Sequence, residues 1–204
     1  MARVLITGAA SGLGAALARE YRARGHEVLG ADLAGADLVL DVRSEGDWRA
    51  AREHVRQVWG GLDILVNNAG VAGGGRVDRT DVQEWHRVLD VNVIGVANGC
   101  AAFAPVFKEQ GQGHLVNVAS LAGLVHPAGM SAYTASKAAV VAMSESLDHE
   151  LSAWGVQVSV VCPSFFRTNL AASLSDTDPV MASISSKLIE RAPFEAEQIA
   201  QRVV

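Results

Sequence analysis

The chain has 204 residues, of which 50% are apolar and 19% are charged, and its formal net charge is −5 at pH 7. This length supports one domain with a full hydrophobic core and is too short for two ordinary ones, so residues 1–204 are expected to form a single domain. The acidic balance and the absence of Lys/Arg runs exclude the charge pattern of a nucleic-acid-binding protein, and no nucleic-acid partner is expected.

The cysteines and the amino terminus indicate the cellular setting. Cys100 and Cys162 lie in apolar stretches without metal-ligand or redox spacing, which predicts two buried thiols in a reducing compartment and no metal site. Arg3 already begins an apolar strand pattern, which leaves no room for a signal peptide, and no apolar run reaches the roughly 18 residues of a membrane span. The expectation is a cytoplasmic protein that does not contact a membrane.

The first predicted unit is a strand over Arg3–Thr7, a glycine-rich turn over Gly8–Gly14 and a helix that continues to Arg24. Glycines in such a turn let backbone N–H groups approach an anion, and the helix N-terminus adds partial positive charge. Such a turn can also be a tight connection without a ligand, but the strand before it and the helix after it favour dinucleotide binding.

The second predicted strand, His26–Asp32, ends on a carboxylate. A carboxylate at this position accepts hydrogen bonds from the adenosine ribose 2′-OH and repels a 2′-phosphate. Leu33 follows Asp32, and the glycine turn carries Ser11 rather than Arg or Lys, so the sequence favours NAD over NADP. The alternative is an Asp that merely stabilises a turn.

A third strand is predicted over Ala36–Val42, only a few residues later. Parallel neighbours normally need a crossover of about a dozen residues, usually a helix, and Leu33–Gly35 cannot hold one. We therefore predict that this crossover helix is missing and that the third strand is a short edge.

The middle of the chain has the pattern of a helix, a strand and a long helix. The predictions are an amphipathic helix over Ser44–Trp59, a fourth strand over Leu62–Val66 that runs into Asn67-Asn68-Ala69-Gly70, and a helical segment from a cap at Thr80 or Asp81 to Gln110. Asn92 lies in an apolar part of that segment, where a buried amide must find hydrogen-bond partners. It either satisfies the core or forms a kink that frees a backbone carbonyl for a bound water.

Residues Asn117 to Val140 contain the candidate reaction centre. A strand ends at Ser120, and Tyr133 begins a helix that carries Lys137 one turn later, which places the phenol and the ammonium on one helix face. Lowering a phenol pKa of ~10 by ~2 units requires roughly 2.7 kcal/mol of preference for the anion. One charge ~4.5 Å away at an effective dielectric of ~20 provides about 3.7 kcal/mol before desolvation. Tyr133 and Lys137 are therefore a candidate proton-transfer pair, although such a pair also occurs incidentally on solvated helices.

The rest of the chain completes an alternating pattern. The predictions are a helix over Ser131–Trp154, a sixth strand over Val156–Cys162, a polar lid segment over Asn169–Pro193 and a helix from Glu195 to Val204. Six strand patterns alternating with helices predict an α/β fold, a Rossmann-like doubly wound parallel sheet of order 3-2-1-4-5-6.

Together these residues resemble the short-chain dehydrogenase/reductase family over essentially the whole chain. The matching motifs are Thr7-Gly8-x-x-x-Gly12-x-Gly14, Asn67-Asn68-Ala69-Gly70, Asn92, Ser120, Tyr133-x-x-x-Lys137 and Pro163-x-x-x-x-Thr168, in the family's order and approximate spacing. The resemblance implies an NAD(P)-dependent oxidoreductase that interconverts an alcohol and a carbonyl compound.

The resemblance also implies residue roles. Tyr133 would exchange a proton with the substrate oxygen, and Ser120 would hydrogen-bond that oxygen. Lys137 would lower the tyrosine pKa and hold the nicotinamide ribose, and Asn92 would bind a water that links Lys137 to solvent. The implied cofactor contacts are Gly8, Ser11, Gly12, Leu13, Gly14, Asp32, Asp41, Val42, Asn68, Ala69, Gly70, Tyr133, Lys137, Pro163, Phe166 and Thr168.

Two features depart from the family pattern. Ser164 stands where many members have Gly, at a position that usually supplies a backbone contact. Members typically continue past the position of Val204 with a further strand and helix, so the given chain is expected to lack the usual seventh strand and to leave the sixth at an exposed edge.

A mainly apolar small-molecule substrate, a secondary alcohol or ketone, is expected from apolar residues near the strand ends, which also suit ordinary core and lid packing. These residues are Leu121, Leu124, Val125, Met130, Phe165, Phe166, Leu170 and Leu174. His126 is expected in a solvated loop or against polar substrate groups. The competing hypothesis is a catalytically silent NAD-binding scaffold. The resemblance further suggests a homodimer or homotetramer built on the two long helices.

Overall fold

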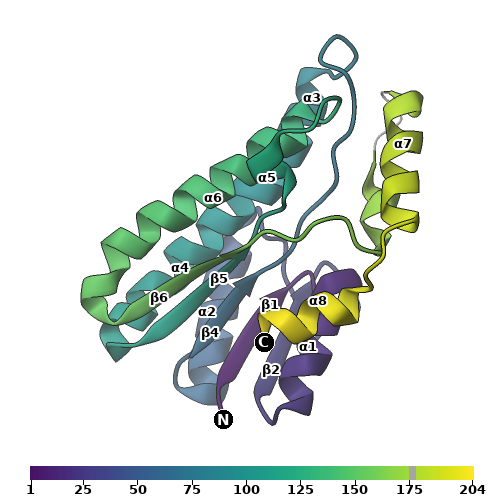
Figure 1. Cartoon of the computed structure of the whole chain (residues 1–204). Coiled ribbons are helices and arrows are strands. Elements are labelled where there is room, and N and C mark those ends of the chain that lie inside the picture. Colours follow the sequence, from purple (N-terminus) through teal and green to yellow (C-terminus); the bar gives the residue numbers. More distant parts are fainter. Residues whose placement is uncertain (175–177) are drawn as a thin grey trace.

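A computed structural model describes residues 1–174 and 178–204 and shows one parallel sheet with helices on both faces (Figure 1). The strands are β1 (Arg3–Thr7), β2 (Glu27–Asp32), β3 (Leu38–Val39), β4 (Ile64–Asn67), β5 (Gly113–Val118) and β6 (Val156–Val161). Their order is β3-β2-β1-β4-β5-β6, which confirms the predicted α/β fold and strand order. Among the described residues, β6 ends the sheet, as expected without a seventh strand.

Two cores lie on opposite faces of the sheet because strand side chains alternate in direction. Val4 and Ile6 of β1 pack with α1 (Gly12–Ala23) and α8 (Ala196–Val203). Leu5, between them, packs on the other face. That face is covered by α2 (Glu45–Trp59), α4 (Gly95–Gln110) and α6 (Ser131–Leu151).

The third strand is the short edge that the sequence predicts, although it is shorter than Ala36–Val42. It consists of Leu38–Val39 alone, paired with Ala31 and Asp32, and no helix separates it from β2. The chain then turns at Asp41, where the Ser44 N–H donates to the Asp41 carbonyl. This early turn brings Asp41, Val42 and Arg43 to the carboxyl side of the sheet.

The predicted long helix is continuous but changes its hydrogen-bond pattern. Of the two predicted caps the structure selects Asp81, whose carboxylate accepts from the Glu84 N–H at 2.8 Å. The helix then runs through α3 (Val82–Leu89), the π-helical turn η1 (Asp90–Ile94) and α4. These 29 residues are long and apolar enough for a membrane span by length and composition, but Phe103 and Phe107 are fully buried in the core beneath the sheet.

The remaining elements lie near the carboxyl ends of the strands or extend α6. They are α5 (Ala122–Val125), η2 (Ser152–Trp154), η3 (Asn169–Ser173) and α7 (Pro179–Glu190). The predicted lid over Asn169–Pro193 thus contains η3 and α7, while its residues 175–177 lie outside the described part. Figure 1 shows α7 standing apart from the helix layers.

Candidate active site

A cavity of about 780 Å³ lies where the six strands end, bounded by the segments that follow β1, β2, β3, β4, β5 and β6. It brings together most of the predicted site residues: Gly8, Ser11, Gly12, Leu13, Asp32, Asp41, Val42, Asn68, Ala69, Gly70, Ser120, Tyr133, Lys137, Pro163, Phe166 and Thr168. Gly14 and Asn92 do not line it. This volume is typical of a small-molecule or cofactor site.

The glycine-rich turn is shaped to receive an anion. Gly8 and Gly12 have φ of 67° and 53°, in the left-handed region that favours glycine. The Ser11 side chain does not cap α1, and the first turn of α1 carries no acidic residue, so its N–H groups are free to bind an anion. A Cβ on Gly12 would come within 2.8 Å of the Thr168 hydroxyl, so the turn also packs against the segment after β6.

Gly14 has a packing role rather than a place in the cavity lining. A Cβ there would lie 2.1 Å from the Gly8 carbonyl oxygen, within the same turn. Direct contact of Gly14 with a molecule in the cavity is therefore not supported, and Gly14 instead lets the turn close on the first residues of α1.

Asp32 is held at the end of β2 with its carboxylate facing the glycine turn. It accepts from the Ala10 N–H at 3.0 Å and from the Leu33 N–H at 2.8 Å. A carboxylate has about four acceptor positions, so Asp32 retains capacity for a ribose hydroxyl. Among the lining residues that the structure describes, Arg43 was missed by the sequence analysis, although it directly follows Asp41-Val42.

Tyr133 and Lys137 share one face of α6, as their spacing predicts. The Lys137 Nζ lies 5.8 Å from the centre of the Tyr133 ring and donates to the Val118 carbonyl at 2.9 Å. Burial lowers the pKa of Lys137 to about 8. Burial also raises the pKa of Tyr133, and hydrogen bonding with Ser120 only partly opposes this. In the cofactor-free chain desolvation of the phenolate is the larger effect on the Tyr133 pKa, and the expected lowering by Lys137 stays a prediction.

Ser120 follows β5 and is fixed by the local backbone. Its hydroxyl accepts from the Ala122 N–H at 3.1 Å, at the start of α5. The neighbouring Leu121 N–H donates to the Pro163 carbonyl, which ties the segment after β5 to the segment after β6. Ser120 therefore lies on the cavity lining, in a segment held by these two hydrogen bonds.

Asn92 is fully buried in η1 and satisfies its own amide. Its Oδ1 accepts from the Val71 N–H at 2.8 Å, and its Nδ2 donates to the Val71 carbonyl at 3.0 Å and to the Ser136 hydroxyl at 3.1 Å. Ser136 in turn donates to the Tyr133 carbonyl. Asn92 thus finds all of these partners within the protein, from a position in the π-helical turn. Its side chain links the loop after β4 to α6 and does not reach the cavity.

Apolar side chains line the part of the cavity next to the predicted lid. They include Leu121, Val125, Met130, Phe165, Phe166, Leu170, Leu174 and Ile189, whereas Leu124 does not line it. Arg87 is a lining cation, but its guanidinium makes two hydrogen bonds of 2.7 Å to the buried Glu84 carboxylate and one to the Ala72 carbonyl. The charge of Arg87 is thus already neutralised.

The structure corrects the expectation for Cys162 and supports the solvated alternative for His126. Cys100 is buried, and burial raises its pKa to about 12, but Cys162 is only partly buried. The side chain of His126 is exposed and does not line the cavity, and its φ of 51° ends α5. Direct contact of His126 with a substrate in the cavity is therefore not supported.

Comparison with known proteins agrees with this geometry. A family model described as short chain dehydrogenase matches residues 2–179. The chain is 35% identical to the 2-(R)-hydroxypropyl-CoM dehydrogenase of Xanthobacter autotrophicus, over 100% of this chain and 90% of that protein. It is 33% identical to a 3-alpha-(or 20-beta)-hydroxysteroid dehydrogenase of Mycobacterium tuberculosis, over 95% of this chain and 77% of that protein.

A solved structure shows the same fold. The crystal structure of a short chain dehydrogenase/reductase from Burkholderia phymatum in complex with NAD has a TM-score of 0.91 and 31% identity, covering 98% of this chain and 83% of that one. The chain therefore belongs to the short-chain dehydrogenase/reductase family of oxidoreductases, which bind a nicotinamide cofactor.

Proposed function

We propose that this chain is an NAD-preferring oxidoreductase that interconverts a secondary alcohol and a ketone, with residues 1–204 as one dinucleotide-binding and catalytic domain. The observation that carries the proposal is that a single cavity joins the open N-terminus of α1 and Asp32 to Ser120, Tyr133 and Lys137. The first group suits a dinucleotide, and the second supplies proton transfer beside it.

In this proposal the residues of the site have different roles. The α1 turn binds the pyrophosphate, Asp32 accepts from the ribose, and Lys137 holds the nicotinamide ribose. When bound, NAD supplies the hydride acceptor. Tyr133 accepts the proton of the substrate hydroxyl during oxidation and returns it during reduction, while Ser120 hydrogen-bonds the same oxygen. Lys137, with a pKa of about 8, is mainly protonated at pH 7 and so favours the phenolate form when it is needed.

The substrate in this proposal is uncharged and mainly apolar. The lining beside the lid is apolar, and the cation there, Arg87, is already bound to Glu84. A substrate anion would have to displace a buried carboxylate to gain that cation, which is costly. The names of both relatives describe hydroxyl substrates, which supports the reaction class, and the segment Asn169–Pro193 is proposed as the lid over that substrate.

The test is binding followed by turnover. Purified protein is titrated with NAD and NADP, and then assayed with a panel of secondary alcohols at the NADH absorbance. Tight NAD binding with turnover of apolar alcohols supports the proposal. NAD binding with no turnover across the panel supports the scaffold hypothesis instead, although a scaffold has no need for Ser120, Tyr133 and Lys137 in one cavity.

We also propose a homodimer or homotetramer that uses the outer faces of α4 and α6. Both helices are long, and α6 carries small exposed or half-buried residues, among them Ala135, Ala138, Ala139 and Ala142, that permit close helix contact. Light scattering of the purified protein gives the oligomeric state, and a monomer at micromolar concentration would contradict this part of the proposal.

A further inference from the structure

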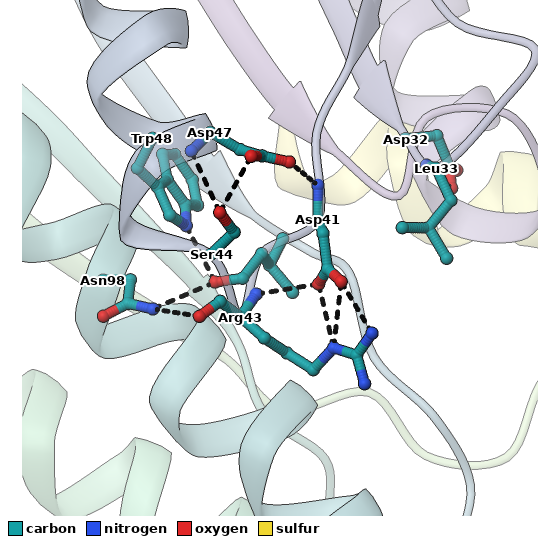
Figure 2. A network of polar contacts seen from close by, with 9 residues as sticks. Asp32, Leu33, Asp41, Arg43, Ser44, Asp47, Trp48 and Asn98 are labelled. Atoms are coloured by element: carbon teal, nitrogen blue, oxygen red, sulfur yellow. Dashed lines mark hydrogen bonds and ion pairs between the residues drawn. The ribbon is translucent and has the colours of Figure 1, made fainter.

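The adenosine side of the cavity contains an ion pair between two neighbouring lining residues, Asp41 and Arg43. The Arg43 Nε donates to both carboxylate oxygens at 2.9 and 3.1 Å, Nη2 donates to Oδ2 at 2.6 Å, and the Arg43 N–H donates to Oδ1 at 3.0 Å (Figure 2). The pair lowers the pKa of Asp41 and raises that of Arg43. In the free chain the guanidinium is therefore paired with a carboxylate through Nε and Nη2.

The backbone that carries this pair is fixed from two helices. The Asp41 N–H donates to the Asp47 carboxylate at 2.9 Å, and the indole of Trp48 donates to the Val42 carbonyl at 2.9 Å. Asn98 of α4 donates to the carbonyls of Val42 and Arg43 at 3.1 and 3.3 Å (Figure 2). Asp41 and Arg43 are thus held at a set position on the same cavity as Asp32 and Leu33.

The charges on the cavity lining make this pair decisive for a phosphate. The described lining residues that carry charge are Asp32, Asp41, Arg43, Arg87 and Lys137. Arg87 is bound to Glu84, and Lys137 lies beside Tyr133, on the reaction side. Arg43 is therefore the remaining cation of this described set, and Figure 2 shows it in the same part of the cavity as Asp32 and Leu33, with no contact drawn between them. Its side chain is half-exposed, with 54% accessible.

We propose that Asp41 is a second determinant of NAD selectivity, because it holds Arg43 in an ion pair and so withholds the guanidinium from the 2′-phosphate of NADP. This inference rests on the proposed NAD site. In this arrangement Asp32 repels the 2′-phosphate directly, and Asp41 removes the cation that would otherwise attract it. Asp90 adds a second, weaker attraction on Arg43 from the helix side.

The proposal predicts that each carboxylate contributes to selectivity, and that only the contribution of Asp41 depends on Arg43. Replacing Asp32 alone removes repulsion but leaves Arg43 bound to Asp41. Replacing Asp41 alone releases Arg43 but leaves Asp32 to repel the phosphate. The double replacement both removes the repulsion and provides the cation, so its effect on NADP binding is about the product of the single effects.

The test is a double-mutant cycle read by calorimetric binding of NAD and NADP to the full chain. The variants are Asp32→Ala, Asp41→Asn and their combination, with Asp41→Glu as the control that keeps the charge. The readout is the ratio of the Kd for NADP to the Kd for NAD. Contacts to the adenine ring are common to both cofactors, so losses of such contacts cancel in this ratio. Circular dichroism and the Tm establish that each variant is folded.

The expected result is a ratio about tenfold lower when Asp41→Asn is introduced, alone or together with Asp32→Ala, with Asp41→Glu close to the wild-type chain. Adding Arg43→Ala to the double variant should remove the gain that Asp41→Asn contributes. An Asp41→Asn variant with the wild-type ratio, or a double variant unaffected by Arg43→Ala, would overturn the inference while NAD binding by the wild-type chain stays intact. A wild-type chain that binds neither cofactor would instead overturn the proposed function.

Discussion

Arg76, in the loop after β4, holds Asp178 at the N-terminus of α7 through an ion pair with an Nε to Oδ2 distance of 2.7 Å. The Arg76 N–H donates to the same oxygen at 3.2 Å, and Asp178 is fully buried. The same carboxylate caps α7 by accepting from the Met181 N–H. One side chain therefore fixes the proposed lid helix to the loop that borders the substrate side of the cavity.

The Asp178→Asn variant should loosen this connection while keeping the cap, because Asn is also a good N-cap residue. We expect KM for the alcohol to rise about three- to tenfold with kcat nearly unchanged, since the variant loses a charge-assisted contact but no reacting group. Asp178→Ala, which also removes the cap, should raise KM further. Steady-state kinetics provide the measurement, and equal KM values for the wild-type and Asn variants would show that the pair does not position the lid.

The ion pair between Arg76 and Asp178 should persist at mildly acidic pH. Arg76 holds the pKa of Asp178 well below its usual range. A carboxyl whose folded-state pKa is lowered contributes stability above its unfolded pKa of about 4 and loses it only as the pH falls through the folded value. Asp178 should therefore stay ionised between pH 5 and pH 8 and cause no change in KM over this range. Any step in KM that the wild-type chain shows there should also be present in the Asp178→Asn variant.

Tyr133→Phe isolates the proton transfer. The change removes the hydroxyl that hydrogen-bonds with Ser120 and keeps the ring, so kcat should fall by roughly 10²- to 10⁴-fold. The Kd for NAD should stay within about threefold, because the ring that borders the cofactor remains. Absorbance assays and calorimetry on the same preparation measure both. A variant that retains a near-normal rate would remove Tyr133 from the proposed role.

The fold could be predicted well because its determinants are local. Each strand is a short apolar run, and Leu33–Gly35 is too short for a crossover helix, so the short edge strand follows from chain length alone. The strand's real limits were not predictable in this way. They depend on the turn at Asp41, which is held by side chains from α2 and α4 that are distant in the sequence.

Most residues of the candidate site could be predicted from the sequence, whereas the pKa of Tyr133 and the packing role of Gly14 could not. Motif spacing placed Ser120, Tyr133 and Lys137 together, since strand ends and helix faces follow simple periodicities. The net direction of the Tyr133 pKa shift in the cofactor-free chain does not follow from the spacing of Tyr133 and Lys137, because burial is a property of the whole fold. Gly14 was placed in the lining because the motif does not distinguish a glycine that touches a ligand from one that touches the turn.

Burial of the charged Lys137 side chain should reduce the free energy of unfolding of the protein. Its pKa is lowered to about 8 from an unfolded value of about 10.4, so below pH 8 folding pays on the order of 3 kcal/mol to bury the charge. Lys137→Met should therefore raise the free energy of unfolding at pH 7 by about 2 kcal/mol, after about 1 kcal/mol is subtracted for the lost hydrogen bond to the Val118 carbonyl. NAD affinity and turnover should fall.

The sign can be checked with pH. As the pH rises from 8 through 10.4, the unfolded lysine also loses its proton, and the advantage of the Met variant should vanish. Urea denaturation of both proteins at pH 7 and pH 10 measures this. Lys187→Met, at an exposed position on α7, is the matched control and should change little. A Lys137→Met variant less stable than the wild-type chain at pH 7 would contradict the assignment of a buried charge.

Gly14→Ala should disable the phosphate-binding turn from within. The added Cβ would lie 2.1 Å from the Gly8 carbonyl oxygen and 2.5 Å from Asn68 Nδ2, so the turn itself must move. Gly46→Ala, inside α2, is the matched control, because its Cβ meets only ordinary contacts at 3.5 Å from the Ser44 hydroxyl and beyond. Alanine favours a helix over glycine by up to about 1 kcal/mol, so the control should be neutral or slightly stabilising.

The Gly14 variant should lose at least about 2 kcal/mol of unfolding free energy and bind NAD at least roughly tenfold more weakly. Calorimetric NAD binding and urea denaturation on both variants decide the matter. Equal NAD affinity in the two would mean that the position of the Gly8 carbonyl does not govern the pyrophosphate site.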